Sequence, residues 1–200
     1  MTAKLILASA SPRRKDLLEE TGVAFEVIPS RIVENFPAGQ TAQVSVKRLA
    51  EEKAVDVAKG HPDRWTLGAD TIVVLPGRGK NGNIMGKPRN AEEARGMLLR
   101  LSAKHHWVMT GVAFARLNEA TGSMETDAFV VTSMVRFRML SHDEIGEYVS
   151  SGEPLDKAGA YAIQGGARKF VERYEGSFSN IVGLPVEEVL EWIKNAGIMP

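Results

Sequence analysis

The chain has 200 residues, no cysteine, and 25 basic against 25 acidic side chains. The absence of cysteine excludes disulfides, thiolate zinc sites and cysteine nucleophiles, and the balanced charge gives no overall attraction to nucleic acid or membrane surfaces. No apolar run approaches the roughly 18 residues of a membrane span. We therefore expect one cytoplasmic domain over residues 1–200, with no nucleic-acid or membrane partner and with anion binding confined to a local site.

The N-terminal segment predicts a buried strand that turns into a helix with a basic start. Leu5–Ala8 is a short apolar run typical of such a strand. Pro12 suits the first helical position, and Ser11 before it suits the N-cap. Arg13 and Arg14 then lie in the first turn, where the helix dipole disfavours bases. Either they join the free backbone N–H groups in a phosphate clamp, or they form a solvated basic helix end.

A strand at 25–28 and a loop to about Gly39 precede a helix over 41–59, whose apolar face carries one charged residue. The apolar and small side chains of this segment recur at helical spacing. Lys53 falls on that same face. Either its stem covers the core while its ammonium reaches water, or the ammonium is delivered into a cleft.

The strongest strand signal, Trp65–Leu75, is interrupted by Asp70 and Thr71. Aspartate is depleted in strands and costly to bury without a partner. A carboxylate in such a run needs an ionic partner, a metal or a catalytic role. Because buried acids with shifted pKa values cluster at active sites, we favour a functional role for Asp70.

The remaining elements alternate between strands and helices. Asn81-Gly82 indicates a hairpin turn, and the lone glycine pattern around it lacks the helix that a dinucleotide site requires. After the hairpin we expect, in order, a helix at 91–101, strands at about 106–117 and 124–138, a helix opened by a capping box at Ser141 and Glu144, strands at 158–165 and 168–176, a loop at 177–183, and a helix from Pro185 to Gly197. This mixed order predicts an α/β or α+β sheet protein with one cleft.

The polar residues that remain as candidates are cations and carboxylates. The four histidines lack metal-ligand spacing, and no nucleophile elbow is present. The candidates are Arg13, Arg14, Lys53, Lys87 and Asp70, with Glu34 as a second acid. Cations and carboxylates without a covalent nucleophile are typical of metal-assisted phosphate chemistry.

Eight segments stand in order along nearly the whole chain: LASASPRRKDLL, VKRLAEEKA, GADTIVVL, GKP, TGVAF, VRFRMLSHDEI, SGEPLDKAGAYAIQG and GSFSNIVGLP. Together they resemble the Maf family of nucleoside triphosphate pyrophosphatases. The resemblance implies a Maf-like (ITPase-like) α/β fold, with an elongated, twisted mixed sheet flanked by helices and two lobes around a deep cleft. It also implies that Mg²⁺ or Mn²⁺ supports hydrolysis of a nucleoside triphosphate to the monophosphate and pyrophosphate, and it suggests a homodimer.

The resemblance also implies a role for each candidate residue. Three positions separate the branches of the family and match the branch that acts on dTTP and UTP, namely Arg13, Thr71 and Gln164. Asp70 corresponds to the proton acceptor, and Glu34 with Asp70 corresponds to the metal site. The expected triphosphate ligands are Ser9, Arg14, Lys53 and Lys87.

One departure from the family pattern keeps other functions open. The loop before the second helix usually reads S-D-x-D-E, whereas here it reads SRIVE at residues 30–34, so two acids are missing. One alternative is the same chemistry on 7-methyl-GTP or on a modified pyrimidine nucleotide, in nucleotide pool cleaning. Another is a non-catalytic nucleotide-binding regulator of cell division and septum formation. The missing acids favour the regulator, whereas Asp70 and Lys53 favour the enzyme.

Overall fold

A computed structural model describes residues 5–37, 39–77 and 83–198 of the chain. Its elements are β1 (Leu5–Leu7), α1 (Pro12–Glu19), β2 (Phe25–Val27), α2 (Ala42–Ala58), β3 (Trp65–Leu75), β4 (Asn83–Met85), α3 (Ala91–Leu101), β5 (His105–Leu117), β6 (Met124–Phe137), α4 (His142–Ser150), the short 3-10 helices η1 (Glu153–Asp156), η2 (Ala158–Ala160) and η3 (Gly166–Phe170), β7 (Val171–Glu175), α5 (Phe178–Val182) and α6 (Val186–Asn195). Among the described residues, no helix is both long and apolar enough to cross a membrane.

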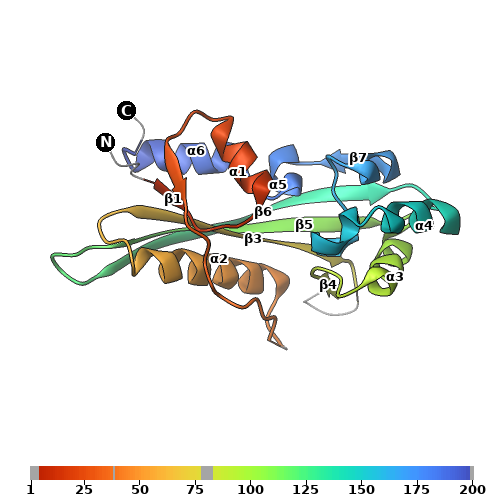
Figure 1. The fold of residues 1–200 in the computed structure, drawn as a ribbon, viewed down its shortest axis with the longest axis horizontal. Helices are drawn as coiled ribbons and strands as arrows, with labels where there is room; N and C mark the ends of the chain where they lie inside the picture. The colour runs from red at the N-terminus through yellow and green to blue at the C-terminus, as the bar shows by residue number, and fades with distance from the viewer. Residues whose placement is uncertain (1–4, 38, 78–82, 199–200) are drawn as a thin grey trace. The chain divides into compact units, whose positions relative to one another are not determined.

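Seven strands form one mixed sheet in the order β2-β1-β3-β5-β6-β7, with β4 added to β3 (Figure 1). Strand β1 runs parallel to β2 and β3. Strands β4 and β7 run antiparallel to their partners β3 and β6. The mixed sheet and its helices confirm the predicted α/β class, and the β3–β4 pair confirms the predicted hairpin. The Asn81-Gly82 turn lies outside the described residues, and the deep cleft stays a prediction.

The chain divides into two compact units. The first unit comprises Met1–Asp70, Thr110–Val131 and Gly183–Pro200, and the second comprises Thr71–Met109 and Thr132–Val182. The boundaries fall inside β3, β5 and β6, so each of these strands contributes one end to each unit. The expectation of a single domain over 1–200 stays a prediction.

In the first unit, α2 packs closely on β3 and β5 because each strand presents a glycine to the helix. A Cβ at Gly68 would lie 2.7 Å from the backbone nitrogen of Ala54, and one at Gly111 would lie 2.6 Å from the carbonyl carbon of Val46. The alanines of this contact form a buried cluster: Ala50, Ala54, Ala58, Ala113 and Ala115. Mid-strand glycine commonly marks such a close backbone approach.

The other face of the same strands is covered by α6. The Trp192 ring stacks on Phe114, with 3.6 Å between ring centroids, and meets Trp65 edge-on at 4.9 Å. Its indole N–H donates a hydrogen bond to Asp127 at 2.8 Å. Figure 1 shows α2 and α6 on opposite sides of the sheet. Within the first unit, the sheet is therefore enclosed between two helices.

In the second unit, α3 and α4 follow the pattern that the sequence predicts. The side of α3 that is buried consists of Ala94, Met97, Leu98 and Leu101. Ser141 and Glu144 form the predicted capping box at the start of α4. Arg138 adds two hydrogen bonds to the Glu144 carboxylate, at 2.5 and 3.2 Å. These hydrogen bonds from Arg138 are the main cause that lowers the pKa of Glu144 to about 2, and the hydrogen bond from the Ser141 backbone N–H is the second.

This shift predicts a pH-dependent contribution to stability. Because the pKa of Glu144 is lower in the folded state, its contribution is complete above the unfolded pKa, about 4.3, and is lost as pH falls toward the folded pKa. Glutamine can still cap the helix, so Glu144→Gln removes chiefly the charge. We expect Glu144→Gln to lower the melting temperature near neutral pH, and the difference from wild type to shrink as the solution is acidified below the unfolded pKa. Thermal melts over this range measure it, and a constant difference would contradict the expectation.

Two predicted strands near the C-terminus are wrong, one wholly and one in part. Residues 158–165 form η2 and a turn instead of a strand. Gly159 and Ala160 there have φ of 67° and 61°, in the left-handed region that lies outside the β region. Of the predicted strand 168–176, only Val171–Glu175 is extended, because Gly166–Phe170 is a 3-10 helix.

The last two elements differ from prediction in smaller ways. The predicted loop 177–183 contains the short helix α5, which begins where Ser177 Oγ accepts a hydrogen bond from the Asn180 backbone N–H. The buried Asn180 side chain also donates to Ser133 Oγ at 2.9 Å. Local sequence patterns cannot predict this contact, because Ser133 and Asn180 are far apart in the chain. The final helix starts one residue after Pro185, which is its N-cap.

Candidate active site

The predicted site residues fall into two groups, one in each unit. Ser9, Arg13, Arg14, Glu34, Lys53 and Asp70 belong to the first unit, and Thr71, Lys87 and Gln164 belong to the second. Asp70 and Thr71 are consecutive residues of β3, so the two groups are joined in the chain at that bond.

Glu34, Lys53 and Asp70 form an ionic group, here called the acid–lysine cluster. The Lys53 Nζ lies 2.7 Å from Glu34 Oε1 and 2.6 Å from Asp70 Oδ1. Lys53 is 8% exposed and Asp70 is 4% exposed. The interpretation of Lys53 as a side chain that reaches water is therefore wrong, because its ammonium is held between two carboxylates.

The two oxygens of Asp70 have different surroundings. Oδ1 accepts the hydrogen bond from Lys53, whereas Oδ2 is buried with no hydrogen-bond partner among the described residues. Burial raises the pKa of Asp70 above its usual range, Lys53 and Arg14 oppose this rise, and Glu34 adds to it. A buried oxygen without a donor is costly, so Oδ2 is a ready acceptor for a water molecule or a ligand for a cation.

The turn from β1 into α1 holds Arg14 in place. Pro12 begins the helix, as the sequence predicts, so Arg13 and Arg14 lie in its first turn. Ser9 Oγ accepts hydrogen bonds from Arg14 Nη1 at 3.3 Å and from the Ser11 backbone N–H at 3.2 Å. Arg14 Nε donates to a backbone carbonyl near the start of α6, that of residue 183, at 2.8 Å. The guanidinium is thus held by hydrogen bonds to Ser9 and to this carbonyl.

The charge of Arg14 is coupled to the acid–lysine cluster. Burial lowers the pKa of Arg14, while Asp70 and Glu34 raise it and Arg13 lowers it further. The guanidinium remains protonated because the pKa of arginine is far above neutral. A fixed cation thus acts electrostatically on both acids.

Side chains of α2 hold the loop that carries Glu34, both before and after that residue. Asp56 Oδ2 accepts a hydrogen bond from Ser30 Oγ at 2.8 Å and another from the next backbone N–H at 2.9 Å. Arg48 Nη2 donates to the backbone carbonyl of Asn35 at 2.8 Å and to its side-chain oxygen at 3.0 Å. The same helix that supplies Lys53 therefore places Glu34 against it.

Two carboxylates of the cluster could share a divalent cation. Across the described ranges, no group of three or more His, Asp or Glu side chains is placed to hold a metal ion. Mg²⁺, however, commonly binds one or two protein carboxylates together with substrate phosphates and water. Glu34 and Asp70 supply two such carboxylates, and Asp70 Oδ2, for which the described residues offer no hydrogen-bond donor, is a suitable ligand.

In the second unit, Thr71 lies on the side of β3 that packs against η2. Successive strand residues point to opposite faces, so Thr71 faces away from the side on which Asp70 meets Lys53. It shares its face with Val73, and a Cβ at Gly159 of η2 would lie only 2.8 Å from a Val73 methyl group.

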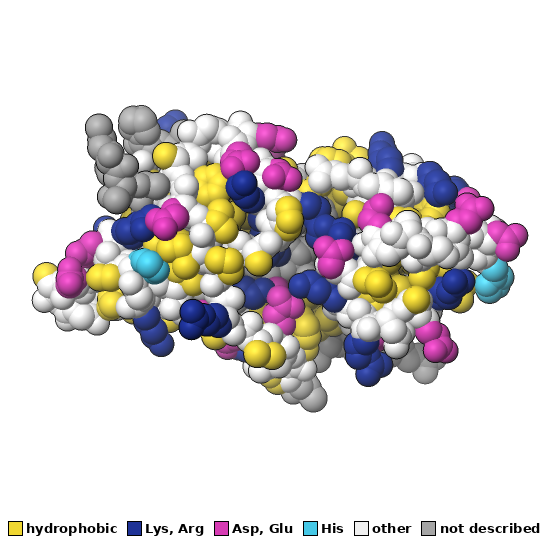
Figure 2. Space-filling model, in the orientation of Figure 1, with side chains coloured by type: hydrophobic (Ala, Val, Ile, Leu, Met, Phe, Trp, Pro, Cys, Tyr) yellow, Lys and Arg dark blue, Asp and Glu magenta, His cyan; other side chains and the backbone are white. Residues whose placement is uncertain are grey.

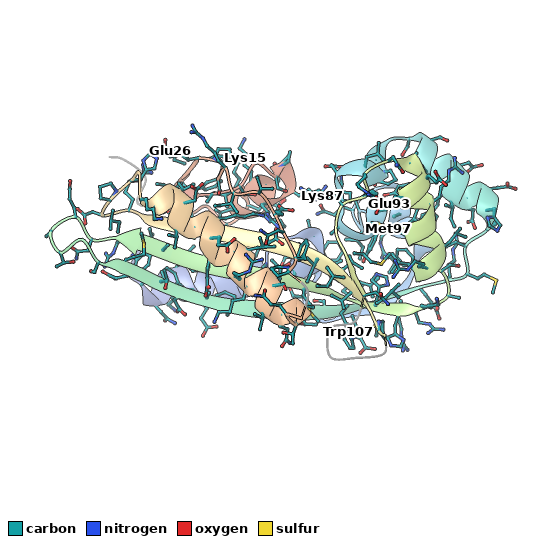
Figure 3. The ribbon with its side chains drawn as sticks, turned by 90° about the horizontal axis from the view of Figure 1, so that it is seen from below. Lys15, Glu26, Lys87, Glu93, Met97 and Trp107 are labelled. Carbon is teal, nitrogen blue, oxygen red and sulfur yellow. The ribbon has the colours of Figure 1, made fainter. Side chains whose placement is uncertain are left out.

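Lys87 and Gln164 belong to segments near this contact. Lys87 lies between β4 and α3, as Figure 3 shows. The residue before it, Gly86, accepts a backbone hydrogen bond from Gly159 at 3.0 Å. Gln164 is exposed in the turn after η2, which is closed by a hydrogen bond from the backbone N–H of residue 165 to the carbonyl of residue 162 at 3.1 Å.

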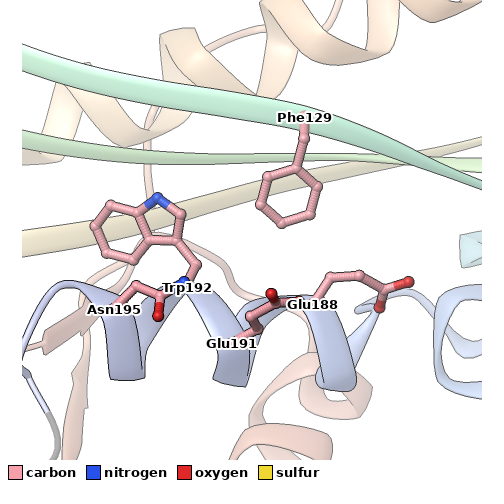
Figure 4. Close-up of a pocket in the computed structure, with 5 residues that line it drawn as sticks. All are labelled: Phe129, Glu188, Glu191, Trp192 and Asn195. Carbon is pink, nitrogen blue, oxygen red and sulfur yellow. The ribbon is translucent and has the colours of Figure 1, made fainter.

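Other surface features do not coincide with these groups. On the face in Figure 2, basic and acidic side chains are interspersed, in keeping with the zero net charge. A cavity of about 260 Å³ opens in the first unit between β6 and α6 (Figure 4). Its lining, which includes none of the predicted site residues, is Phe129, Glu188, Glu191, Trp192 and Asn195.

Several residues that shape the first group are not identified by sequence reasoning. Gly68 and Gly111 let α2 approach the sheet. Each glycine interrupts a strand pattern, and this is a sequence feature that indicates a close backbone approach. Arg48 and Asp56 anchor the loop, but no local pattern reveals a partner that depends on the path of the loop.

In comparisons with known proteins, the matched part of the chain includes every predicted site residue of both groups. A family model described as Maf-like protein matches residues 4–196. The chain is 48% identical over 197 residues to a dTTP/UTP pyrophosphatase of Syntrophus aciditrophicus, covering 98% of this chain and 92% of that protein. It is 49% identical over 194 residues to one of Myxococcus xanthus (97% and 93% covered). It is 47% identical over 193 residues to one of Halalkalibacterium halodurans (96% of each).

Proposed function

The chain belongs to the Maf-like protein family, and on this premise we propose that it hydrolyses dTTP and UTP to the nucleoside monophosphate and pyrophosphate. The observation that carries the proposal is its identity, over nearly the full length of both chains, to relatives named dTTP/UTP pyrophosphatase. The acid–lysine cluster supports it, because positioning and charge stabilisation by such groups provide most of the catalysis in phosphoryl transfer.

In this proposal the residues divide between phosphate binding and base selection. The ligands of the triphosphate are Ser9, Arg14, Lys53 and Lys87. The residues that select the base are Arg13, Thr71 and Gln164. The chemistry of Gln164 supports its role, because a glutamine amide offers both a hydrogen-bond donor and an acceptor to the edge of a uracil-type base.

Asp70 acts as the general base of the proposed reaction. A water molecule gives its proton to Asp70 while its oxygen forms a bond to the α-phosphorus. The bond between that phosphorus and the oxygen bridging to the β-phosphate breaks, and its electron pair leaves with pyrophosphate. The hydrogen bond from Lys53 at 2.6 Å orients the carboxylate. The raised pKa favours this role, because a general base works best with a pKa near the working pH.

We also propose that Glu34 and Asp70 hold Mg²⁺ or Mn²⁺ together with the triphosphate. Such an ion, when bound, stabilises the negative charge that develops on the phosphate oxygens. The two carboxylates support this assignment, as does Asp70 Oδ2, which no donor within the described part of the chain reaches. Titration with Mn²⁺ followed by electron paramagnetic resonance tests it, and binding should weaken when either acid is replaced by its amide.

The products of the reaction test the proposed function. With Mg²⁺ present, we expect dTTP and UTP to yield the monophosphate and pyrophosphate without a transient diphosphate, because attack occurs at the α-phosphorus. Ion-exchange chromatography separates these products. Release of orthophosphate with dTDP would contradict the proposal. Faster turnover of 7-methyl-GTP would favour the other branch of the family, and nucleotide binding without turnover would favour the regulator.

Location and assembly are proposed from the sequence and the family resemblance. We place the protein in the cytoplasm, where its nucleotide substrates occur, and we propose that it is a homodimer. Sedimentation equilibrium of the purified protein tests the second proposal, which a mass near that of one chain, 21.8 kDa, would contradict.

A further inference from the structure

The turn that carries Gln164 is held at both ends by one pair of side chains. The Tyr148 hydroxyl accepts a hydrogen bond from the Ala162 backbone N–H at 3.2 Å and donates one to Glu153 Oε1 at 2.9 Å. The other carboxylate oxygen, Glu153 Oε2, accepts a hydrogen bond from the Gly166 backbone N–H at 3.1 Å. A continuous chain of hydrogen bonds therefore runs from the residue two before Gln164 to the residue two after it.

Packing reinforces these hydrogen bonds. A Cβ at residue 165 would lie 2.6 Å from the carboxyl carbon of Glu153, so only glycine admits the carboxylate there. A Cβ at Gly166 would lie 3.2 Å from the Tyr148 ring. Tyr148 is 4% exposed, and burial raises its pKa, so the phenol keeps the proton that it donates. The turn is consequently clamped between the carboxylate and the ring.

The supported residue contributes little to packing itself. Gln164 is exposed, whereas the polar groups beneath it satisfy one another and the backbone on each side of it. Tyr148 and Glu153 lie on α4 and η1, so both supports come from neighbouring helical elements of the second unit. A turn whose backbone is held in this way presents its side chain from a fixed position, and less freedom of the backbone is lost when a ligand binds.

We propose that Tyr148 and Glu153 are positioning residues, which fix Gln164 against the base and so set the preference for dTTP and UTP. This inference rests on the base-selecting role of Gln164 in the proposed function. Neither side chain touches the substrate. Each acts through the backbone of the turn, and loss of either lets the Gln164 amide leave the position from which it reads the base.

Four single variants test the hydrogen-bonded support that Tyr148 and Glu153 give to the turn, here called the brace. Tyr148→Phe removes the hydroxyl and both of its hydrogen bonds but keeps the ring. Glu153→Ala removes the carboxylate, whereas Glu153→Gln keeps an acceptor for the Gly166 N–H. Tyr161→Phe is the matched control, because it removes another buried hydroxyl of the second unit, one bonded to His106 Nε2 at 2.8 Å and outside the brace.

We expect Tyr148→Phe and Glu153→Ala to lower kcat/KM for dTTP and UTP about tenfold, chiefly through KM, because small misplacements of a binding group are costly. Glu153→Gln should recover most of the loss, and Tyr161→Phe should match wild type. Amide hydrogen exchange at residues 162 and 166 should accelerate in the first two variants. Wild-type kcat/KM in Tyr148→Phe, or unchanged exchange there, would overturn the brace.

A double variant distinguishes positioning of Gln164 from a general structural role. If the brace acts through that side chain, Tyr148→Phe should cause no further loss of kcat/KM in a Gln164→Ala background, because coupled residues are not additive. A further tenfold loss would overturn the inference. If Gln164→Ala alone leaves kcat/KM for both nucleotides unchanged, the base-selecting role in the proposed function fails instead, whatever the exchange data show.

Discussion

Replacing Asp70 with asparagine should lower the rate of dTTP hydrolysis at least about 10²-fold, the lower end of the range for loss of a general base. Asparagine keeps the size of the side chain and can still accept the hydrogen bond from Lys53. It cannot take a proton from water, and it removes one negative charge from the proposed metal site. Nucleotide binding should persist, because most of the proposed phosphate ligands lie elsewhere.

The same substitution should leave the melting temperature unchanged or raise it. Because burial raises the pKa of Asp70, the folded state binds this proton more tightly than the unfolded chain does. Stability is therefore lost as pH rises through the folded pKa, and asparagine removes that cost at neutral pH. Lys53 is not left without a counter-ion, since Glu34 stays 2.7 Å from its Nζ.

Turnover and melting temperature should be measured on one preparation of Asp70→Asn. Asp63→Asn is a suitable control, because it makes the same chemical change at an exposed carboxylate of the first unit. A variant that melts much earlier but turns over dTTP at the wild-type rate while folded would show that Asp70 is only a structural ion-pair partner.

Gly68→Ala should be among the most destabilising single substitutions in the chain. The added methyl group would lie within 2.7 Å of the Ala54 backbone nitrogen and closer still to the Ala50 carbonyl oxygen. Backbone of a helix cannot yield as a side chain can, so α2 must move off the sheet. Overpacking typically costs about 1–3 kcal/mol and occasionally more, and we expect the upper end here. Urea unfolding followed by circular dichroism measures the loss.

Gly96→Ala provides a matched control for this substitution. Gly96 is exposed inside α3, and among the described residues no atom beyond its own stretch of helix lies within 4 Å of a Cβ built there. There alanine should stabilise the protein by roughly 0.5–1 kcal/mol through helix propensity. Equal stability of Gly68→Ala and wild type would mean that α2 tolerates displacement. In that case the close packing of α2 on the sheet would not be what places the Lys53 Nζ against Asp70.

Local patterns predicted the elements that carry the first group of site residues. The helical period predicted a helix over 41–59, observed as Ala42–Ala58, and placed Lys53 on its buried face. Asp70 was conspicuous because it interrupts an apolar strand. Ser11 and Pro12 identified the start of α1. In each case the information lies within a few residues of the feature, which is why the sequence suffices.

The contacts that depend on the path of a loop could not be predicted in this way. Glu34 meets Lys53 from a loop that Arg48 and Asp56 hold against α2. The sequence predicts a strand at 158–165, but the positive φ of Ala160 is set by its surroundings rather than by alanine itself. The hydrogen-bonded support of Gln164 likewise joins segments that no periodicity connects.

The alternation of side chains along β3 also restricts how this protein can change length during evolution. Gly68 and Asp70 face α2, while Thr71 and Val73 face η2. Because the period of a strand is two residues, a single inserted or deleted residue here would exchange the two faces beyond it. Alignment gaps are therefore expected to avoid β3 and to gather instead in exposed turns, such as 118–123 between β5 and β6.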